Sequence, residues 1–287
     1  MQNKVVVGVD IGGTSISAGC LVDNTLVKKA QANTNSGRSV PEILKTLYEV
    51  IDLVWTKDVQ AIGIGVPGYV DIEKGEIRLI NNIPSFQGLV LKNEVENHYN
   101  VPAYINNDAN SFALGAYYFG IQSVCTNVVG LTLGTGLGGG IVINGKLHSG
   151  LFGGAGEFGC MPYLDATFED YCSSKFFAKK YNTNGKDLFI QAKNGDSDAL
   201  IIFEEFGSHI GNLILHILYT LSPEIVIIGG SISKSAEFFM SGVKMIIEKF
   251  PVEIIRKNFK IEVSQLEYPE IYGAAALCLS EFSGRAD

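Results

Sequence analysis

The sequence VVVGVDIGGT, residues 5–14, is an apolar run that ends in an aspartate and a pair of glycines. Residues 5–9 are typical of a buried strand, so Asp10, Gly12 and Gly13 lie where this strand must turn. Glycine lets backbone N–H groups approach an anion without a Cβ in the way, and Thr14 adds a hydroxyl. Asp10 can hold a hydrated divalent cation through water. The stretch therefore predicts a turn that binds phosphate.

A second stretch of the same design, VGLTLGTG at residues 129–136, aligns with residues 7–14. Each copy has the pattern of a strand, a glycine-rich turn and a second strand. Each also leads into a predicted hairpin, with Asp-Asn at residues 23–24 in the first copy and Asn-Gly at residues 144–145 in the second. Two hairpins of like design predict a duplicated α/β unit, with a nucleotide bound between its halves.

Composition and charge restrict the class of protein. The chain has 287 residues, of which 46% are hydrophobic, enough for one large domain or two lobes. No charged start precedes an apolar segment, and no apolar run approaches the roughly 20 residues that cross a bilayer, so we expect a cytoplasmic protein without a membrane partner. The net charge of -8 is spread along the chain, which argues against nucleic acid as a partner. Five cysteines without a C-x-x-C pair argue against a disulfide framework and an ordinary structural zinc site.

Hydrophobic periodicity predicts most of the other elements. The expected strands lie at residues 61–66, 102–105 and 225–228, with a short surface hairpin over residues 71–79. The expected helices lie near residues 39–54, 91–98, 109–119, 168–181 and 198–221, and a final Ala-rich helix is bracketed by Pro269 and Gly273. Asp108 is then at or next to the N-cap of the helix over residues 109–119, where a carboxylate satisfies free backbone donors.

The glycines at residues 134–139 also match G-x-G-x-x-G, the dinucleotide-binding fingerprint. That fingerprint requires a helix directly after the glycines, whereas residues 140–145 have the pattern of a strand and a hairpin. A P-loop is excluded as well, because no glycine precedes Lys-Ser or Lys-Thr at the required spacing.

The motifs in this order resemble those of the ROK family of sugar kinases, in the actin-like, hexokinase and heat-shock ATPase superfamily. The resemblance covers nearly the whole chain and implies an α/β protein with a duplicated ribonuclease H-like fold and an active-site cleft between two lobes. A sugar and phosphate lobe over residues 1–116, completed by a C-terminal helix over residues 272–287, would face a nucleotide lobe over residues 117–271. A homodimer is also expected.

The resemblance implies ATP and Mg²⁺ as cofactors, and a role for each motif. Two turns would bind the phosphates and a third the adenosine, through Asp10, Gly12, Gly13, Thr14, Gly134, Thr135, Gly136, Gly229 and Gly230, with Asp10 holding Mg²⁺ through water. A second set would bind the sugar, namely Gly68, Asn107, Asp108, Glu157, Cys160 and Glu169. Asp108 would be the base that accepts the proton of the attacking hydroxyl.

Each of these residues, taken alone, also has a structural interpretation. Asp10 could form a turn, Asp108 could cap a helix, Asn107 could be a turn residue and Glu157 a solvated loop charge. Glu169 could belong to the wet face of an amphipathic helix. The ordered occurrence of the motifs favours the functional roles.

Two departures from the family pattern concern zinc. The family usually has His where Cys160 stands, followed by a C-x-C-G-x-x-G-C zinc loop, whereas residues 160–167 here lead straight to Phe168 and Glu169, with only Cys172 nearby. Two thiols cannot complete a tetrahedral zinc site. We therefore predict no structural zinc, and expect apolar packing to hold this loop through Met161, Tyr163 and Leu164.

The reaction implied by the resemblance is transfer of the γ-phosphoryl group of ATP to the 6-hydroxyl of a hexose, with glucose favoured. A kinase for N-acetylmannosamine or N-acetylglucosamine is the alternative within the same class, and a non-catalytic sugar sensor is the alternative from another class. Relatives that regulate transcription carry an N-terminal helix-turn-helix module. We expect none here, because the first strand begins at about Lys4.

Overall fold

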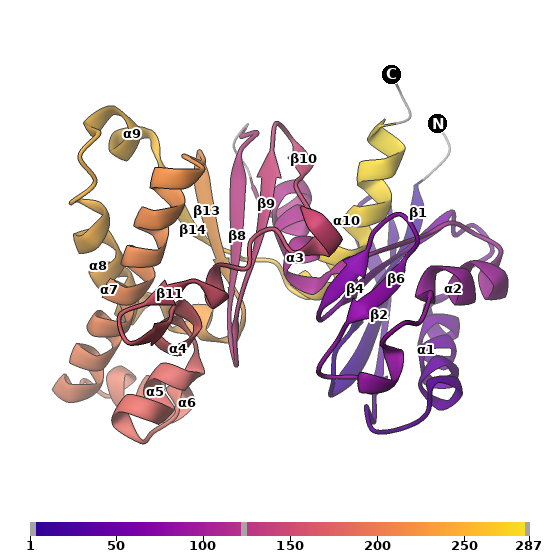
Figure 1. Cartoon of the computed structure of the whole chain (residues 1–287), viewed down its shortest axis with the longest axis horizontal. Coiled ribbons are helices and arrows are strands. Elements are labelled where there is room, and N and C mark those ends of the chain that lie inside the picture. The colour runs from indigo at the N-terminus through magenta and orange to yellow at the C-terminus, as the bar shows by residue number, and fades with distance from the viewer. Residues whose placement is uncertain (1–3, 122–124, 285–287) are drawn as a thin grey trace.

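The computed structural model describes residues 4–121 and 125–284, which form two lobes, each built on a five-stranded sheet (Figure 1). The first sheet has the order β3-β2-β1-β4-β7, with strands β1 (Val5–Ile11), β2 (Ser15–Val22), β3 (Thr25–Asn33), β4 (Ala61–Val66) and β7 (Ala103–Asn107). The second has the order β10-β9-β8-β13-β14, with strands β8 (Val128–Leu133), β9 (Leu137–Ile143), β10 (Lys146–Leu147), β13 (Ile225–Gly229) and β14 (Lys260–Val263).

The two sheets share one topology. β1 pairs antiparallel with β2 and parallel with β4, and β8 pairs in the same way with β9 and β13. β7 and β14 then extend their sheets in parallel. The predicted duplication, α/β class and two-lobed fold are confirmed. Asp10 lies within β1, opposite Ser17, and Thr132 takes the corresponding place in β8, opposite Gly138.

Helices cover both sheets. In the first lobe α1 (Val40–Val54) and α2 (Leu91–Tyr99) bury Ile43, Leu47 and Val95 in one core with the strands. A small hairpin of β5 (Tyr69–Asp71) and β6 (Glu76–Leu79) follows β4. The second lobe contains α6 (Gly185–Lys193), the packed pair α7 (Ser197–Thr220) and α8 (Ala236–Ile247), and the short α9 (Glu253–Asn258).

Two expected helices differ from the prediction. The helix expected over residues 168–181 is broken into α4 (Phe168–Cys172) and α5 (Ser174–Tyr181), because Ser173 is extended and its hydroxyl accepts a hydrogen bond from the backbone of Lys175. The helix expected over residues 109–119 is α3 (Asp108–Gly115), which continues into a π-helical turn over Ala116–Gly120.

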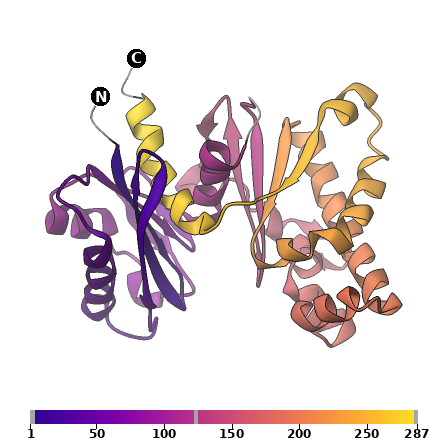
Figure 2. The ribbon, with the colours of Figure 1, turned by 180° about the vertical axis from the view of Figure 1, so that it is seen from behind.

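α3 and α10 (Pro269–Gly284) lie between the sheets, and the segment before α10 crosses from the second lobe back to the first (Figure 2). Glycines in β1 and β4 allow α10 to pack closely on both strands. A Cβ on Gly8 of β1 would lie 2.2 Å from the carbonyl oxygen of Ile271, and a Cβ on Gly63 of β4 would lie 1.9 Å from the carbonyl oxygen of Ala274. Since α3 contacts strands of both sheets, the division of the chain at residue 116 stays a prediction.

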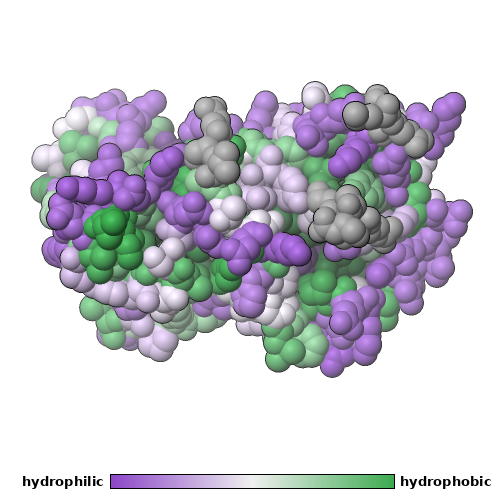
Figure 3. All heavy atoms as spheres, turned by 90° about the horizontal axis from the view of Figure 1, so that it is seen from above, coloured by the Kyte–Doolittle hydropathy of each residue, from purple (hydrophilic) through white to green (hydrophobic). Residues whose placement is uncertain are grey.

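The face in Figure 3 mixes hydrophilic and apolar side chains. Within residues 4–121 and 125–284, no helix combines the length and apolar character needed to cross a membrane.

Candidate active site

Two carboxylates lie close together where β1 and β4 end and α3 begins. Gly65 of β4 lies between them, so that a Cβ there would be 3.5 Å from Oδ1 of Asp10 and 3.6 Å from Cα of Asp108. Gly65 is therefore next to both acidic residues. The sequence motifs that predicted Asp10 and Asp108 are separated by almost a hundred residues, and the parallel strands bring them together.

Both carboxyl groups have raised pKa values. Loss of hydration raises the pKa of Asp10 to about 7, with further increases from the charges of Asp108 and Glu270. Loss of hydration also raises the pKa of Asp108 to about 6; the hydrogen bond from Ala109 opposes this, and the charge of Glu157 adds to it. Asp108 is accessible to solvent, while protein atoms surround its other sides. A carboxylate with this pKa is ionised at neutral pH and remains basic enough to accept a proton.

Asn107 is the residue that caps α3. Its Oδ1 accepts hydrogen bonds from the backbone N–H of Ala109, at 2.9 Å, and of Asn110, at 3.1 Å. Its Nδ2 donates to the carbonyl oxygen of Gly68 at 3.2 Å. Asp108 is therefore the first residue of the helix rather than its cap, and one asparagine ties the turn at Gly68 to the start of α3.

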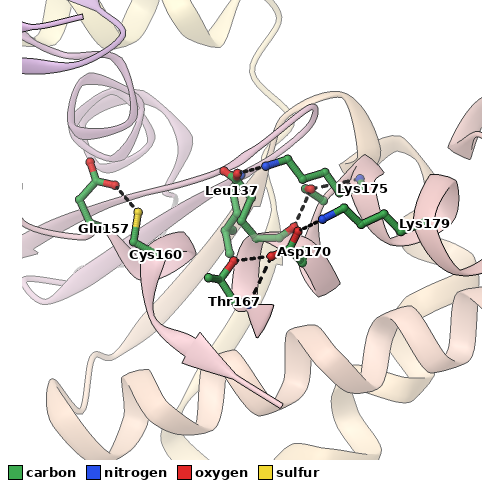
Figure 4. Close-up of polar contacts among 9 residues, drawn as sticks. Leu137, Glu157, Cys160, Thr167, Asp170, Lys175 and Lys179 are labelled. Atoms are coloured by element: carbon green, nitrogen blue, oxygen red, sulfur yellow. Dashed lines mark hydrogen bonds and ion pairs between the residues drawn. The ribbon is translucent and has the colours of Figure 1, made fainter. Parts of the chain in front are cut away.

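The residues expected to bind the sugar come from three separate segments. Gly68 has φ +140°, and a Cβ there would lie 2.2 Å from the carbonyl oxygen of Leu79, so only glycine fits. Glu157 lies close enough to raise the pKa values of Asp108 and Tyr69 by its charge. The thiol of Cys160 donates to Oε2 of Glu157 at 3.6 Å (Figure 4). The structure thus groups Glu157 and Cys160 with Asp108, and Asn107 links Gly68 to the same helix start.

The first glycine turn is held by Thr34, the residue that directly follows β3. The hydroxyl of Thr34 donates to the carbonyl oxygen of Gly12 at 2.6 Å, and the N–H of Thr34 donates to the carbonyl oxygen of Thr14 at 2.9 Å. A Cβ at Gly13 would lie 3.2 Å from the backbone oxygen of Asn82. The turn is therefore fixed from both sides.

The second glycine turn and the turn after β13 lie against each other. Gly134 N–H donates to the carbonyl oxygen of Gly136 at 3.0 Å, and the side chain of Thr135 is exposed at the tip. Gly230, the residue after Gly229, has a φ of +84°. It packs so closely on the end of β8 that a Cβ on Gly230 would lie 2.4 Å from the carbonyl oxygen of Leu133. These contacts bring the two expected nucleotide-binding segments together.

Glu169 lies against the second glycine turn. Its Oε2 accepts a hydrogen bond from the N–H of Leu137 at 3.1 Å, and its Oε1 pairs with the ammonium of Lys175. This placement is specific, which argues against the wet face of a helix as its environment.

The loop over residues 160–167 is held by aromatic packing. Tyr163 stacks on Phe168 with ring centroids 4.1 Å apart, and its hydroxyl forms a hydrogen bond with Nδ1 of His209 at 3.1 Å. Met161 and Tyr163 pack on the second-lobe core, as expected. The expectation for Leu164 is wrong: its side chain is 70% exposed, because Leu164 takes up a positive φ between β11 (Pro162–Tyr163) and β12 (Ala166–Thr167).

The two cysteines near this loop lie in different environments: Cys172 is buried in the core, and Cys160 is exposed. The part of the chain that the structure describes holds no group of three or more His, Cys, Asp or Glu side chains suited to a metal ion. The lack of a structural zinc stays a prediction, to be checked by elemental analysis of the purified protein.

The residues around Asp10 fit a hydrated Mg²⁺ ion. Carboxylate and hydroxyl oxygens are the hard donors that Mg²⁺ prefers, and it usually keeps several of its waters. The mutual repulsion that helps raise the pKa of Asp10 is also what a divalent cation would relieve.

Sequence reasoning missed four residues around these groups: Tyr69, Thr34, Glu270 and Lys175. Only Tyr69 had a local signal, because it directly follows Gly68. The other three reach the site through tertiary packing.

Comparisons with known proteins identify the family of the chain. The family model described as "ROK family" matches residues 6–281. A glucokinase of Thermotoga maritima is 29% identical, over 99% of this chain and 100% of its own length. A xylose repressor of Caldicellulosiruptor bescii is 28% identical, over 96% of this chain and 78% of its own length. The crystal structure of a ROK family glucokinase from Streptomyces griseus in complex with glucose and AMPPNP has a TM-score of 0.81 and 28% identity, and the match covers 95% of this chain and 98% of that one.

These similarities support a sugar kinase that binds ATP. They extend over nearly the whole chain and include the two glycine turns and the residues around Asp108. The chain belongs to the ROK family.

Proposed function

We propose that this protein is an ATP-dependent hexose kinase that phosphorylates the 6-hydroxyl of its sugar, with glucose as the favoured substrate. The observation that carries the proposal is the position of Asp108. Its carboxyl group has a pKa of about 6, lies beside Asp10 at the first glycine turn, and begins the helix that Asn107 ties to Gly68. This position supports a role for Asp108 as a base between residues suited to sugar hydroxyls and residues suited to phosphates.

In the proposed reaction, Asp108 accepts the proton of the sugar hydroxyl as that oxygen attacks the γ-phosphorus of ATP. The bond from the γ-phosphorus to the β,γ-bridging oxygen breaks, and ADP leaves with that oxygen. Asn107, Glu157 and the backbone at Gly68 hold the sugar hydroxyls. Asp10 would hold Mg²⁺ through water, and the ion would neutralise charge on the phosphates. The backbone N–H groups of the glycine turns position the phosphates. Closure of the lobes over the sugar excludes water that would otherwise hydrolyse ATP.

The pH dependence is a first prediction. We expect kcat/KM for the sugar to rise with pH towards a plateau, because Asp108 must be deprotonated to accept a proton and its pKa is about 6. Because ATP also titrates, the midpoint of the wild-type pH profile alone does not identify Asp108. The diagnostic result is the difference in midpoint between the wild type and a variant. Glu157→Gln removes a charge that raises the pKa of Asp108, and should therefore move the midpoint to lower pH. Identical midpoints in both enzymes would contradict the assignment.

The choice of sugar gives a second prediction, at Cys160. A thiol is a weaker hydrogen-bonding group than the imidazole that the family usually has there. Cys160→His should therefore favour glucose over N-acetylated hexoses by roughly 1–3 kcal/mol, or about 5- to 150-fold in the ratio of kcat/KM values. Cys160 is exposed, which leaves the larger ring access to solvent. A folded variant with an unchanged ratio would show that this position does not select the sugar.

The direct test of the proposal is release of ADP, measured by a coupled assay across glucose, mannose, N-acetylmannosamine and N-acetylglucosamine. Glucose is expected to give the highest kcat/KM. A preference for an N-acetylated sugar would support the amino-sugar kinase instead. Sugar binding without ADP release from any of the four would support a sensor, the class to which the similarity with a xylose repressor also points.

A further inference from the structure

We propose that Lys175 is a positioning residue for the second glycine turn, and that it acts through the carboxylate of Glu169 to set how tightly the nucleotide binds. The inference rests on the proposed function in one respect, namely that residues 134–136 bind the phosphates of ATP. It concerns α4, α5 and the break between them, which the sequence pattern did not reveal.

The carboxylate of Glu169 joins the turn to Lys175. One oxygen accepts from the N–H of Leu137 at 3.1 Å, and the other pairs with the ammonium of Lys175 (Figure 4). A Cβ at Gly136 would lie 2.7 Å from Oε2 of Glu169, so the carboxylate packs directly on the turn. The hydrogen bond to Glu169 also raises the pKa of Lys175, which keeps the ammonium charged.

The same segment holds the other end of the turn. The N–H of Ser174, the first residue of α5, donates to the carbonyl oxygen of Gly134 at 2.9 Å. The hydroxyl of Ser173 donates to the carbonyl oxygen of Glu169 at 2.6 Å, which fixes α4 to α5. Residues 169–174 therefore contact the turn at Gly134 and at Leu137, and the break between the helices is what allows both contacts.

Charge makes Lys175 necessary in this arrangement. The carboxylate of Glu169 lies beside the expected site for the ATP phosphates and would repel them. The side chain of Glu169 is 32% exposed, so solvent screens its charge only in part. Lys175 neutralises this carboxylate. Removing Lys175 alone should therefore leave an uncompensated negative charge at the turn, which is worse for nucleotide binding than removing both charges.

A neighbouring ion pair provides the matched control. Lys179 lies one turn further along α5 and pairs with Asp170 at 2.5 Å. Asp170 accepts a hydrogen bond from the hydroxyl of Thr167 at 2.9 Å instead of contacting the glycine turn (Figure 4). Lys179→Met thus removes an ammonium from the same helix without affecting Glu169.

The experiment measures the Kd of Mg-AMPPNP by calorimetry, and KM and kcat by assay, for single and double variants. For Lys175→Met we expect Kd and the KM of ATP to rise roughly tenfold, with kcat and the KM of the sugar nearly unchanged. Lys175→Arg should restore binding, and Lys179→Met should match the wild type. In the Glu169→Gln background, adding Lys175→Met should change Kd by less than about threefold, because the charge to be compensated is gone.

Equal losses of affinity on Lys175→Met in the two backgrounds would overturn the inference, as would a wild-type Kd in Lys175→Met. A Glu169→Gln variant that raises only the KM of the sugar would also overturn it, and would place Glu169 in the sugar site. Failure of the proposed function is distinguishable: the wild type would then bind Mg-AMPPNP without phosphorylating any sugar, and the comparison of Kd values would still decide the role of Lys175.

Discussion

Asp108→Asn is expected to lower kcat by about 10²–10⁴-fold, the usual contribution of a general base. The amide keeps the shape of the side chain and can still accept from the N–H of Ala109, a bond that Oδ1 of Asp108 makes at 2.8 Å. It cannot take up the proton of the sugar hydroxyl at neutral pH. Sugar affinity, measured by calorimetry, should change little.

Stability separates this loss from unfolding. The folded protein raises the pKa of Asp108 above its ordinary value of 3.8, so the unfolded chain binds fewer protons between pH 4 and pH 6, and the free energy of unfolding falls as the pH rises through that window. An asparagine does not titrate, so the free energy of unfolding of the variant does not fall in this way. At pH 8 the variant should therefore melt at the wild-type temperature or above it. Asp58→Asn changes an exposed aspartate between α1 and β4 and serves as the control. Nearly wild-type turnover in Asp108→Asn would remove Asp108 from the mechanism.

Gly63→Ala is expected to destabilise the whole fold. The new Cβ would lie 1.9 Å from the carbonyl oxygen of Ala274 and 2.8 Å from its carbonyl carbon, both backbone atoms of α10. A helix backbone cannot rotate out of the way as a side chain can, so α10 must move off β4. Overpacking in a core typically costs 1–3 kcal/mol, and a backbone clash belongs at or above the upper end, about 3 kcal/mol.

Thermal and urea denaturation measure this loss, which corresponds to several degrees in Tm for a chain of this size. Gly37→Ala is the control, because nothing lies within 4 Å of a Cβ there and its φ is outside the left-handed region. Equal melting temperatures for the two variants would show that the contact between α10 and β4 is not as close as described.

The sequence predicted the parts of the fold that local patterns encode. The apolar runs that end in glycine turns at residues 12–13 and 134–136 defined both lobes, and the first of them included Asp10. Asp108 came from a separate motif, Asn107 and Asp108, through the family resemblance. The break at Ser173 was not predictable, since the apolar pattern continues through it and the carbonyl of Gly134 that binds Ser174 lies 40 residues away. Leu164 was misjudged because hydrophobicity does not reveal that a residue takes up a positive φ at a hairpin tip.

The central claim is transfer of phosphoryl from ATP to the 6-hydroxyl of a hexose by a base at Asp108. It is tested most directly by ³¹P nuclear magnetic resonance on a mixture of the protein, Mg-ATP and glucose. The account predicts equal amounts of ADP and of one phosphomonoester coupled to the protons on C6. It predicts no phosphomonoester with 6-deoxyglucose, and formation of both products about 10²–10⁴-fold more slowly with Asp108→Asn. Release of inorganic phosphate alone, a monoester at another carbon, or glucose binding without any turnover would contradict it.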